Sequence, residues 1–95
     1  MFHKKQREQR IIDMANMIKA NLPAEATLVS MDYNGKIFGN IVVVIEFAKV
    51  NHIFTTDRGD IYHNGKMLCN RSYHYIEKDD TFSKLLKMIK RELDF

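Results

Sequence analysis

Three histidines at a constant spacing are the first candidates for chemistry in this sequence. His52, His63 and His74 are eleven residues apart, and three imidazoles brought together on neighbouring strands can bind zinc. The turns described below, however, place His63 opposite Ile53, on the face of a sheet away from His52. The three side chains are therefore not expected to converge, and the sequence predicts no metal and no other cofactor.

A single cysteine and the absence of catalytic motifs argue against an enzyme. Cys69 is the only cysteine, so no intrachain disulfide can form and a reducing cytoplasm is the expected compartment. We expect Cys69 to point inward from a short strand, where a free cysteine behaves as a small hydrophobe. The chain has no glycine-rich phosphate loop, paired-carboxylate motif or Gly-x-Ser-x-Gly elbow. The tripeptide at 58–60 matches an integrin-binding sequence, but a turn explains its residues. Because the chain has no catalytic motif, we expect no catalysis.

The size and composition are those of one folded domain spanning residues 1–95. The chain has 95 residues, of which 45% are hydrophobic and 28% charged, a balance typical of a globular domain. Its basic N-terminus leads into an amphipathic segment containing Asp13 and Lys19, and not into an apolar run. We therefore predict neither a signal peptide nor a membrane segment.

Two amphipathic helices are predicted, one at each end of the chain. The first runs from about residue 4 to residue 21 and ends there because Pro23 disfavours helical geometry at Leu22. The second begins after Asp79 or Asp80, either of which can cap it. The apolar residues that recur at helical spacing are Ile11, Met14, Ala15, Ile18 and Leu22 in the first helix and Phe82, Leu85, Leu86, Ile89 and Leu93 in the second.

The residues between the helices predict an antiparallel meander of four or five strands. The β-branched stretch 38–50 is its central strand, and turn sequences at 32–36, 57–60 and 63–66 connect the strands. The first turn places Met31 opposite Ile37, so that odd-numbered residues of both strands, Thr27 and Val29 among them, face the core. The expected fold is a two-layer α+β domain in which both helices pack on one face of the sheet.

The even-numbered residues of this sheet predict an unusually apolar outer face. They are Phe38, Val42, Val44, Phe54, Tyr62 and Leu68. Such a face is more apolar than a solvent-exposed sheet face usually is. We expect it to be covered by the 73–76 segment, by a second copy of the chain or by another protein. A one-residue error in the register of a hairpin is the alternative explanation.

We therefore expect a non-catalytic protein-interaction module that binds a partner protein or itself. A small inhibitor or immunity-type accessory protein of bacterial or phage origin fits this size. Aspartate at Val44 or Phe54 is expected to leave the fold intact and to abolish assembly.

Nucleic-acid binding is the alternative function. The net charge is +3, and the basic helix residues are Lys4, Lys5, Arg7, Arg10, Lys84, Lys87, Lys90 and Arg91. The order helix, meander, helix resembles that of double-stranded-RNA-binding domains, which grip phosphates with a basic start to the second helix. Here that helix starts with Asp79, Asp80 and Thr81, so the basic cluster of that family is missing. Binding through these helices would weaken steeply as salt rises.

Overall fold

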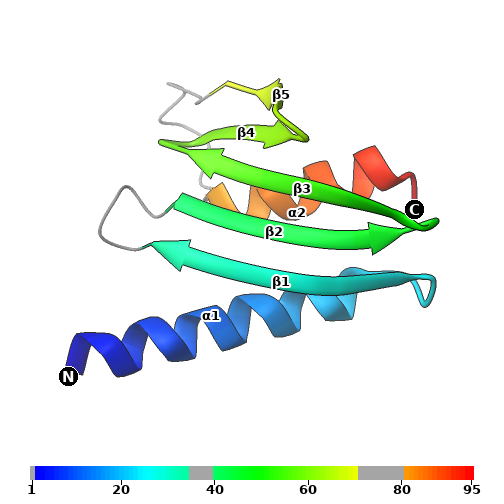
Figure 1. Cartoon of the computed structure of the whole chain (residues 1–95). Helices are drawn as coiled ribbons and strands as arrows, with labels where there is room; N and C mark the ends of the chain where they lie inside the picture. Colours follow the sequence, from blue (N-terminus) through cyan, green and yellow to red (C-terminus); the bar gives the residue numbers. More distant parts are fainter. Residues whose placement is uncertain (1, 35–39, 71–80) are drawn as a thin grey trace.

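The fold is an open antiparallel sheet with one helix at each end of the chain. The computed structural model describes residues 2–34, 40–70 and 81–95, with side chains from residue 6 onward. The elements are α1 (Phe2–Asn21), β1 (Ala26–Asn34), β2 (Asn40–Phe47), β3 (Val50–Asp57), β4 (Asp60–His63), β5 (Lys66–Cys69) and α2 (Thr81–Leu93). The five strands follow one another in the sheet in chain order (Figure 1). The predicted α+β fold is confirmed.

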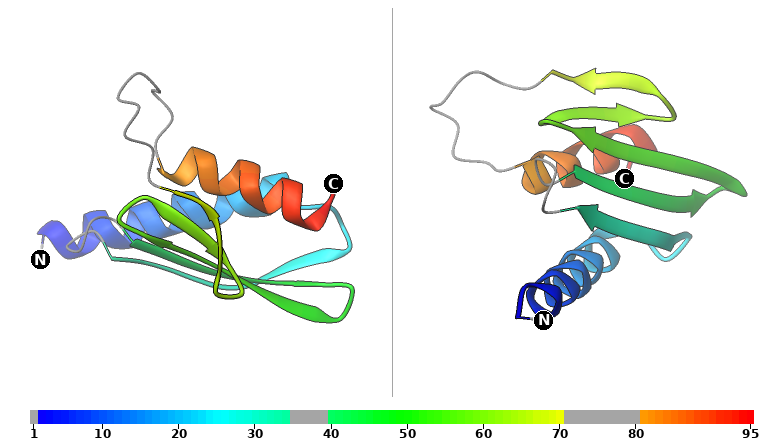
Figure 2. Two further views of the ribbon diagram at one scale, coloured as in Figure 1. Left: turned by 90° about the horizontal axis from the view of Figure 1, so that it is seen from above. Right: turned by 60° about the vertical axis from the view of Figure 1, so that its left-hand side comes forward.

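Both helices lie on the same side of the sheet (Figure 2). α1 runs along β1 at one edge, and α2 crosses behind the middle strands. Neither is long and apolar enough to cross a membrane, as judged over the described residues. Because both helices lie on the same side, no described helix or strand covers the opposite face of the sheet.

The core lies between the sheet and the two helices. The odd-numbered residues Ile41, Val43 and Ile45 of β2 are fully buried in it, as predicted. The helices supply the apolar stripes read from their sequences, with Met14 and Ile18 from α1. The buried residues of α2 are Phe82, Leu85, Ile89 and Leu93. Cys69 also packs against this core, as expected.

The turn between β2 and β3 has only two residues, which the sequence did not indicate. Phe47 pairs with Val50, and both Ala48 and Lys49 have positive φ angles, of 54° and 64°. Two such residues in succession form the type I′ turn that suits the twist of a hairpin. The Asn64–Gly65 turn has the same conformation with the residue types that favour it. Ala48 and Lys49 are not such residues, because their Cβ atoms disfavour left-handed backbone.

We expect the double substitution Ala48→Asn, Lys49→Gly to stabilise the protein by about 1 kcal/mol, because it removes two side chains from left-handed positions that they disfavour. Urea unfolding of the two proteins at the same pH measures the difference. Gly65→Ala in the β4–β5 turn is the reverse test and should be destabilising, although a Cβ there meets no atom within 4 Å. An equal stability of the double variant and the wild type would contradict the turn conformation.

The predicted register of β1 and β2 is wrong, because β1 continues into the predicted turn as far as Asn34. Asp32, Tyr33 and Asn34 belong to β1, and Met31 pairs with Val43 and not with Ile37. A bulge between Leu28 and Ser30 then changes which residues face inward. Leu28 packs against the core, whereas Val29, expected inside, is 55% exposed.

Candidate interaction surface

Five apolar side chains form a patch on the open face of the sheet. Directly paired residues of neighbouring antiparallel strands share a face, so Val44 and Ile53 lie side by side. In the next row Val42 pairs with Thr55, Thr55 with Tyr62, and Tyr62 with Met67. We call this set, made of Val42, Val44, Ile53, Tyr62 and Met67, the outer patch.

The outer patch is open to solvent in the described structure. Val42 is 43% exposed, and Ile53 and Met67 are each 44% exposed. Val44 and Tyr62 are partly buried by their neighbours. Isolated exposed apolar residues are common on proteins, but a contiguous group that crosses four strands is typical of an interaction site.

The structure confirms the outward position of three of the six residues predicted for this face and corrects two. Val42, Val44 and Tyr62 lie on it, and Phe38 falls outside the described residues. The prediction for Phe54 is wrong, because the two-residue turn pairs Phe54 with Val43 and buries it completely in the core. Its neighbour Ile53 takes the outward position.

Leu68 is the second correction. An irregularity in the ladder pairs Ile61 with Cys69 but Tyr62 with Met67, so Leu68 lies between two paired positions and packs against the core. Met67 therefore takes the outward position. The segment 73–76, one of the three candidates to cover this face, lies outside the described residues.

Two of the basic residues predicted to contact nucleic acid hold α1 against the sheet. Arg7 donates hydrogen bonds of 2.9 Å to the Asp32 carboxylate and to the Tyr33 carbonyl oxygen. The guanidinium of Arg10 lies over the Tyr33 ring, 5.3 Å from its centroid, in the position of a cation–π contact. The side chains of Lys4 and Lys5 lie outside the part of the chain that the structure describes. The basic turns of α1 thus have a structural role, which weakens the case for phosphate binding.

The basic residues of α2 lie in the helix layer, away from the outer patch. Lys87, Lys90 and Arg91 are exposed there, and Lys84 is partly buried. Arg91 forms an ion pair with Glu92, with 3.5 Å between Nε and Oε2. These positions stay a prediction for nucleic-acid contact.

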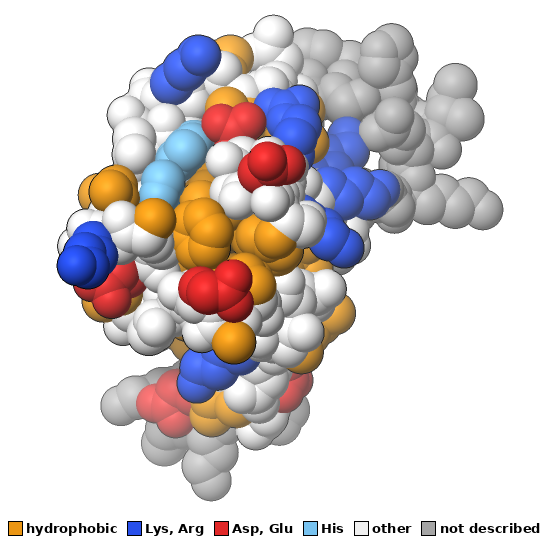
Figure 3. Space-filling view, turned by 90° about the vertical axis from the view of Figure 1, so that its right-hand side faces the viewer, with side chains coloured by type: hydrophobic (Ala, Val, Ile, Leu, Met, Phe, Trp, Pro, Cys, Tyr) orange, Lys and Arg blue, Asp and Glu red, His pale blue; other side chains and the backbone are white. Residues whose placement is uncertain are grey.

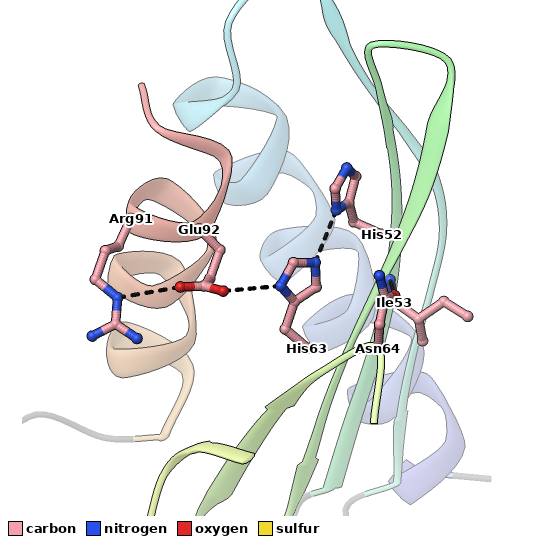
Figure 4. A network of polar contacts seen from close by, with 6 residues as sticks. All are labelled: His52, Ile53, His63, Asn64, Arg91 and Glu92. Atoms are coloured by element: carbon pink, nitrogen blue, oxygen red, sulfur yellow. Dashed lines mark hydrogen bonds and ion pairs between the residues drawn. The ribbon is translucent and has the colours of Figure 1, made fainter. Parts of the chain in front are cut away.

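The structure brings together a second group of side chains that can carry or transfer protons. The sequence analysis had placed two of them, both histidines, on opposite faces of the sheet. His63 Nε2 lies 2.8 Å from His52 Nδ1, and His63 Nδ1 lies 3.0 Å from Glu92 Oε1 (Figure 4). Because a carboxylate only accepts, His63 donates from Nδ1 to Glu92. The His63 ring also stacks on Phe54, nearly parallel and with centroids 4.5 Å apart. We call His52, His63 and Glu92 the relay.

The end of α2 holds Glu92 in place for this contact. Asp94 has a positive φ of 59°, its N–H bonds the Arg91 carbonyl, and the N–H of Phe95 bonds the Lys90 carbonyl. This is the Schellman arrangement that ends a helix. It closes α2 directly after the turn that carries Glu92.

Burial and hydrogen bonding shift two of the relay's pKa values. The hydrogen bond from His63 lowers the pKa of Glu92, against the opposing effect of burial, and the positive charge of Arg91 lowers it further. Burial lowers the pKa of His52, as does the nearby His63, while a hydrogen bond with the Phe47 backbone opposes the change. Glu92 is therefore charged and His52 neutral near pH 7.

The relay fastens α2 to β3 and β4 at one end of the molecule. Figure 3 views that end, where histidine side chains are visible beside hydrophobic ones. His63 and Glu92 are only 16% and 26% exposed. Among the residues that the structure describes, no group of three His, Cys, Asp or Glu side chains is placed to hold a metal ion.

The prediction that His52 and His63 lie on opposite faces is thus wrong, because β4 pairs His63 with Phe54 and not with Ile53. His63 pairs with Phe54 and His52 with Ile45, so both rings face the helix layer. A two-residue reading of the Arg58–Gly59 turn, with Asp57 paired with Asp60, would have found this from the sequence. His74 lies outside the described residues.

Comparisons with protein-family models, with curated proteins and with solved structures found no match for this chain.

Proposed function

We propose that the protein is a non-catalytic interaction module that binds another protein through the outer patch. The observation that carries this proposal is that Val42, Val44, Ile53, Tyr62 and Met67 lie in two neighbouring rows on the face without helices. Three of them, Val42, Ile53 and Met67, are exposed. Covering such an area with a partner is favourable by roughly 25 cal/mol for each Å² of apolar surface removed from water.

An inhibitor or immunity-type accessory protein of bacterial or phage origin is the class that we favour, since such proteins act by binding alone. The cytoplasm is the proposed compartment because the chain's only cysteine, Cys69, gives it no intrachain disulfide.

The test compares substitutions in the outer patch with a matched substitution elsewhere. Ile53→Asp and Val44→Asp place a charge in the patch, and Met17→Asp places one on α1 at a methionine that is 50% exposed. All three should stay folded, because Ile53 and Met17 are both about half exposed and Val44 keeps contact with solvent. Immobilised wild type and variants are used to capture proteins from cells that encode the chain, with quantitative mass spectrometry as the readout.

We expect at least one protein to be retained by the wild type and by Met17→Asp and to fall by about tenfold or more with Ile53→Asp and Val44→Asp. Titration calorimetry with that protein, once purified, then measures the same difference directly. Urea unfolding of each variant is the control. A loss of more than about 2 kcal/mol on Ile53→Asp would mean that the face is internally covered, and equal capture by all four proteins would also reject the proposal.

A further inference from the structure

His52 and His63 meet edge to edge, each through one ring nitrogen. Nδ1 of His52 lies 2.8 Å from Nε2 of His63, and the ring centroids are 5.1 Å apart with the planes inclined by 29°. The centroid separation exceeds the nitrogen contact by about the width of one ring, so the two nitrogens lie between the rings and point at each other (Figure 4). At this separation one hydrogen fits between them, so one ring donates and the other accepts.

The number of protons on the pair decides whether this contact can form. Nδ1 of His63 carries a hydrogen, because it donates to the Glu92 carboxylate at 3.0 Å. When the pair holds one positive charge, one of the two facing nitrogens is still without a proton and can accept. When both rings are charged, every ring nitrogen carries a hydrogen, and two N–H groups face each other. The second proton is therefore incompatible with the observed geometry.

The neighbouring charges hold His63 in place and make His52 the ring that can leave. Glu92 contacts His63 on the side away from His52, so its carboxylate stabilises a charge on His63. Within the described residues no carboxylate contacts His52, whose other hydrogen bond is with the Phe47 backbone. The remaining charged groups on the elements around the pair are Arg91, Asp94 and the terminal carboxylate at the end of α2, Lys66 of β5 and Lys49 of the β2–β3 turn. Among all these groups, the charge that acts on His52 is that of His63.

Mild acid is the condition that brings the second proton. Burial and the charge of His63 lower the pKa of His52 from 6.5. Because a base with a lowered pKa is held neutral by the fold, its contribution to stability is complete above pH 6.5 and is lost as the pH falls through the lowered value. His52 is only partly buried, so its charged ring gains hydration by turning outward.

We propose that the relay is a proton-sensitive switch, in which the second proton expels the His52 ring into solvent. His63 keeps its bond to Glu92, so α2 stays attached to β4. The His52 ring leaves its place beside Ile45, its partner in β2, which is fully buried in the observed state. Mild acid therefore opens the core at the end of the β2–β3 hairpin, while the rest of the fold is kept.

Nuclear magnetic resonance of the full chain between about pH 8 and about pH 5 tests this proposal. The ring nitrogen shifts report the protonation of each histidine. Amide exchange at Ile45 and His52, corrected for the intrinsic effect of pH, reports the opening, and the amides of α2 are the internal reference. His63→Gln and His52→Asn are the matched variants, because each places an amide group near the lost nitrogen but takes up no proton.

In the wild type we expect His52 to take up its proton below pH 6.5. Exchange at Ile45 and His52 should then become about tenfold faster relative to α2, the effect of one lost hydrogen bond. In His63→Gln the pKa of His52 should rise toward its ordinary value and the acceleration should disappear, because the amide oxygen accepts from the charged ring. His52→Asn should show no acceleration either.

Protonation of His52 without faster exchange would overturn the proposal, since the two charged rings would then share the site. Acceleration of the same size in His63→Gln or in His52→Asn would also overturn it, because the opening would not need the paired rings. So would equal acceleration in α2, which would show that the whole domain unfolds in acid.

Discussion

Phe54→Ala should lower the free energy of unfolding by about 3 to 5 kcal/mol, the range for a large aromatic side chain removed from a core. Phe54 is fully buried, pairs with Val43 and stacks on His63, so its removal leaves a cavity and an unsupported imidazole. Domains of this size are stable by only about 5 to 15 kcal/mol. Aspartate at Phe54 should therefore unfold the protein, contrary to the expectation from the sequence.

Ile53→Ala is the matched control, one residue away on the other face. Because Ile53 is 44% exposed, we expect its truncation to destabilise by about 1 kcal/mol or less. Urea unfolding followed by circular dichroism measures both variants. Since a one-residue slip moves every side chain of a strand to the opposite face, a larger effect at Ile53 than at Phe54 would show that β3 pairs with β2 in the other register.

The sequence predicts the elements of this fold well, because their patterns are strong and local. The two apolar stripes identify the helices, and the alternation at Ile41, Val43 and Ile45 identifies the core side of β2. The Asn64–Gly65 and Arg58–Gly59 turns are found because glycine adopts positive φ without strain. These features depend on neighbouring residues only.

The errors come from places where the pairing is decided by tertiary packing. Ala48 and Lys49 occupy left-handed positions that their residue types disfavour, so no local signal marks that turn. The bulge after Leu28 and the irregularity beside Leu68 each shift a strand by one residue. A single shift exchanges inside for outside, which is why Phe54 and Leu68 were assigned to the outer face in place of Ile53 and Met67.

The relay is a consequence of the same register. Once β4 is paired correctly with β3, His52 and His63 share the face that α2 covers, and the last turn of α2 presents the Glu92 carboxylate to His63. Partial burial makes these hydrogen bonds stronger than they would be in water. The relay should therefore contribute measurably to the attachment of α2.

Glu92→Gln tests that contribution, and we expect it to lower stability by about 2 kcal/mol at pH 7, because a neutral amide replaces the charged acceptor of the His63 hydrogen bond. Glu25→Gln, the same substitution at an exposed position, should change stability by less than about 0.5 kcal/mol. Urea unfolding at a series of pH values measures both.

The pH dependence separates a charged relay from simple packing. The pKa of Glu92 is lowered from 4.5 in the folded protein, so the unfolded chain binds a proton more readily as the pH falls. The stabilisation is therefore complete above about pH 4.5 and is lost as the pH falls through the lowered value. The difference between wild type and Glu92→Gln should shrink in that window, whereas a difference that stays constant down to pH 3 would mean that Glu92 acts through packing alone.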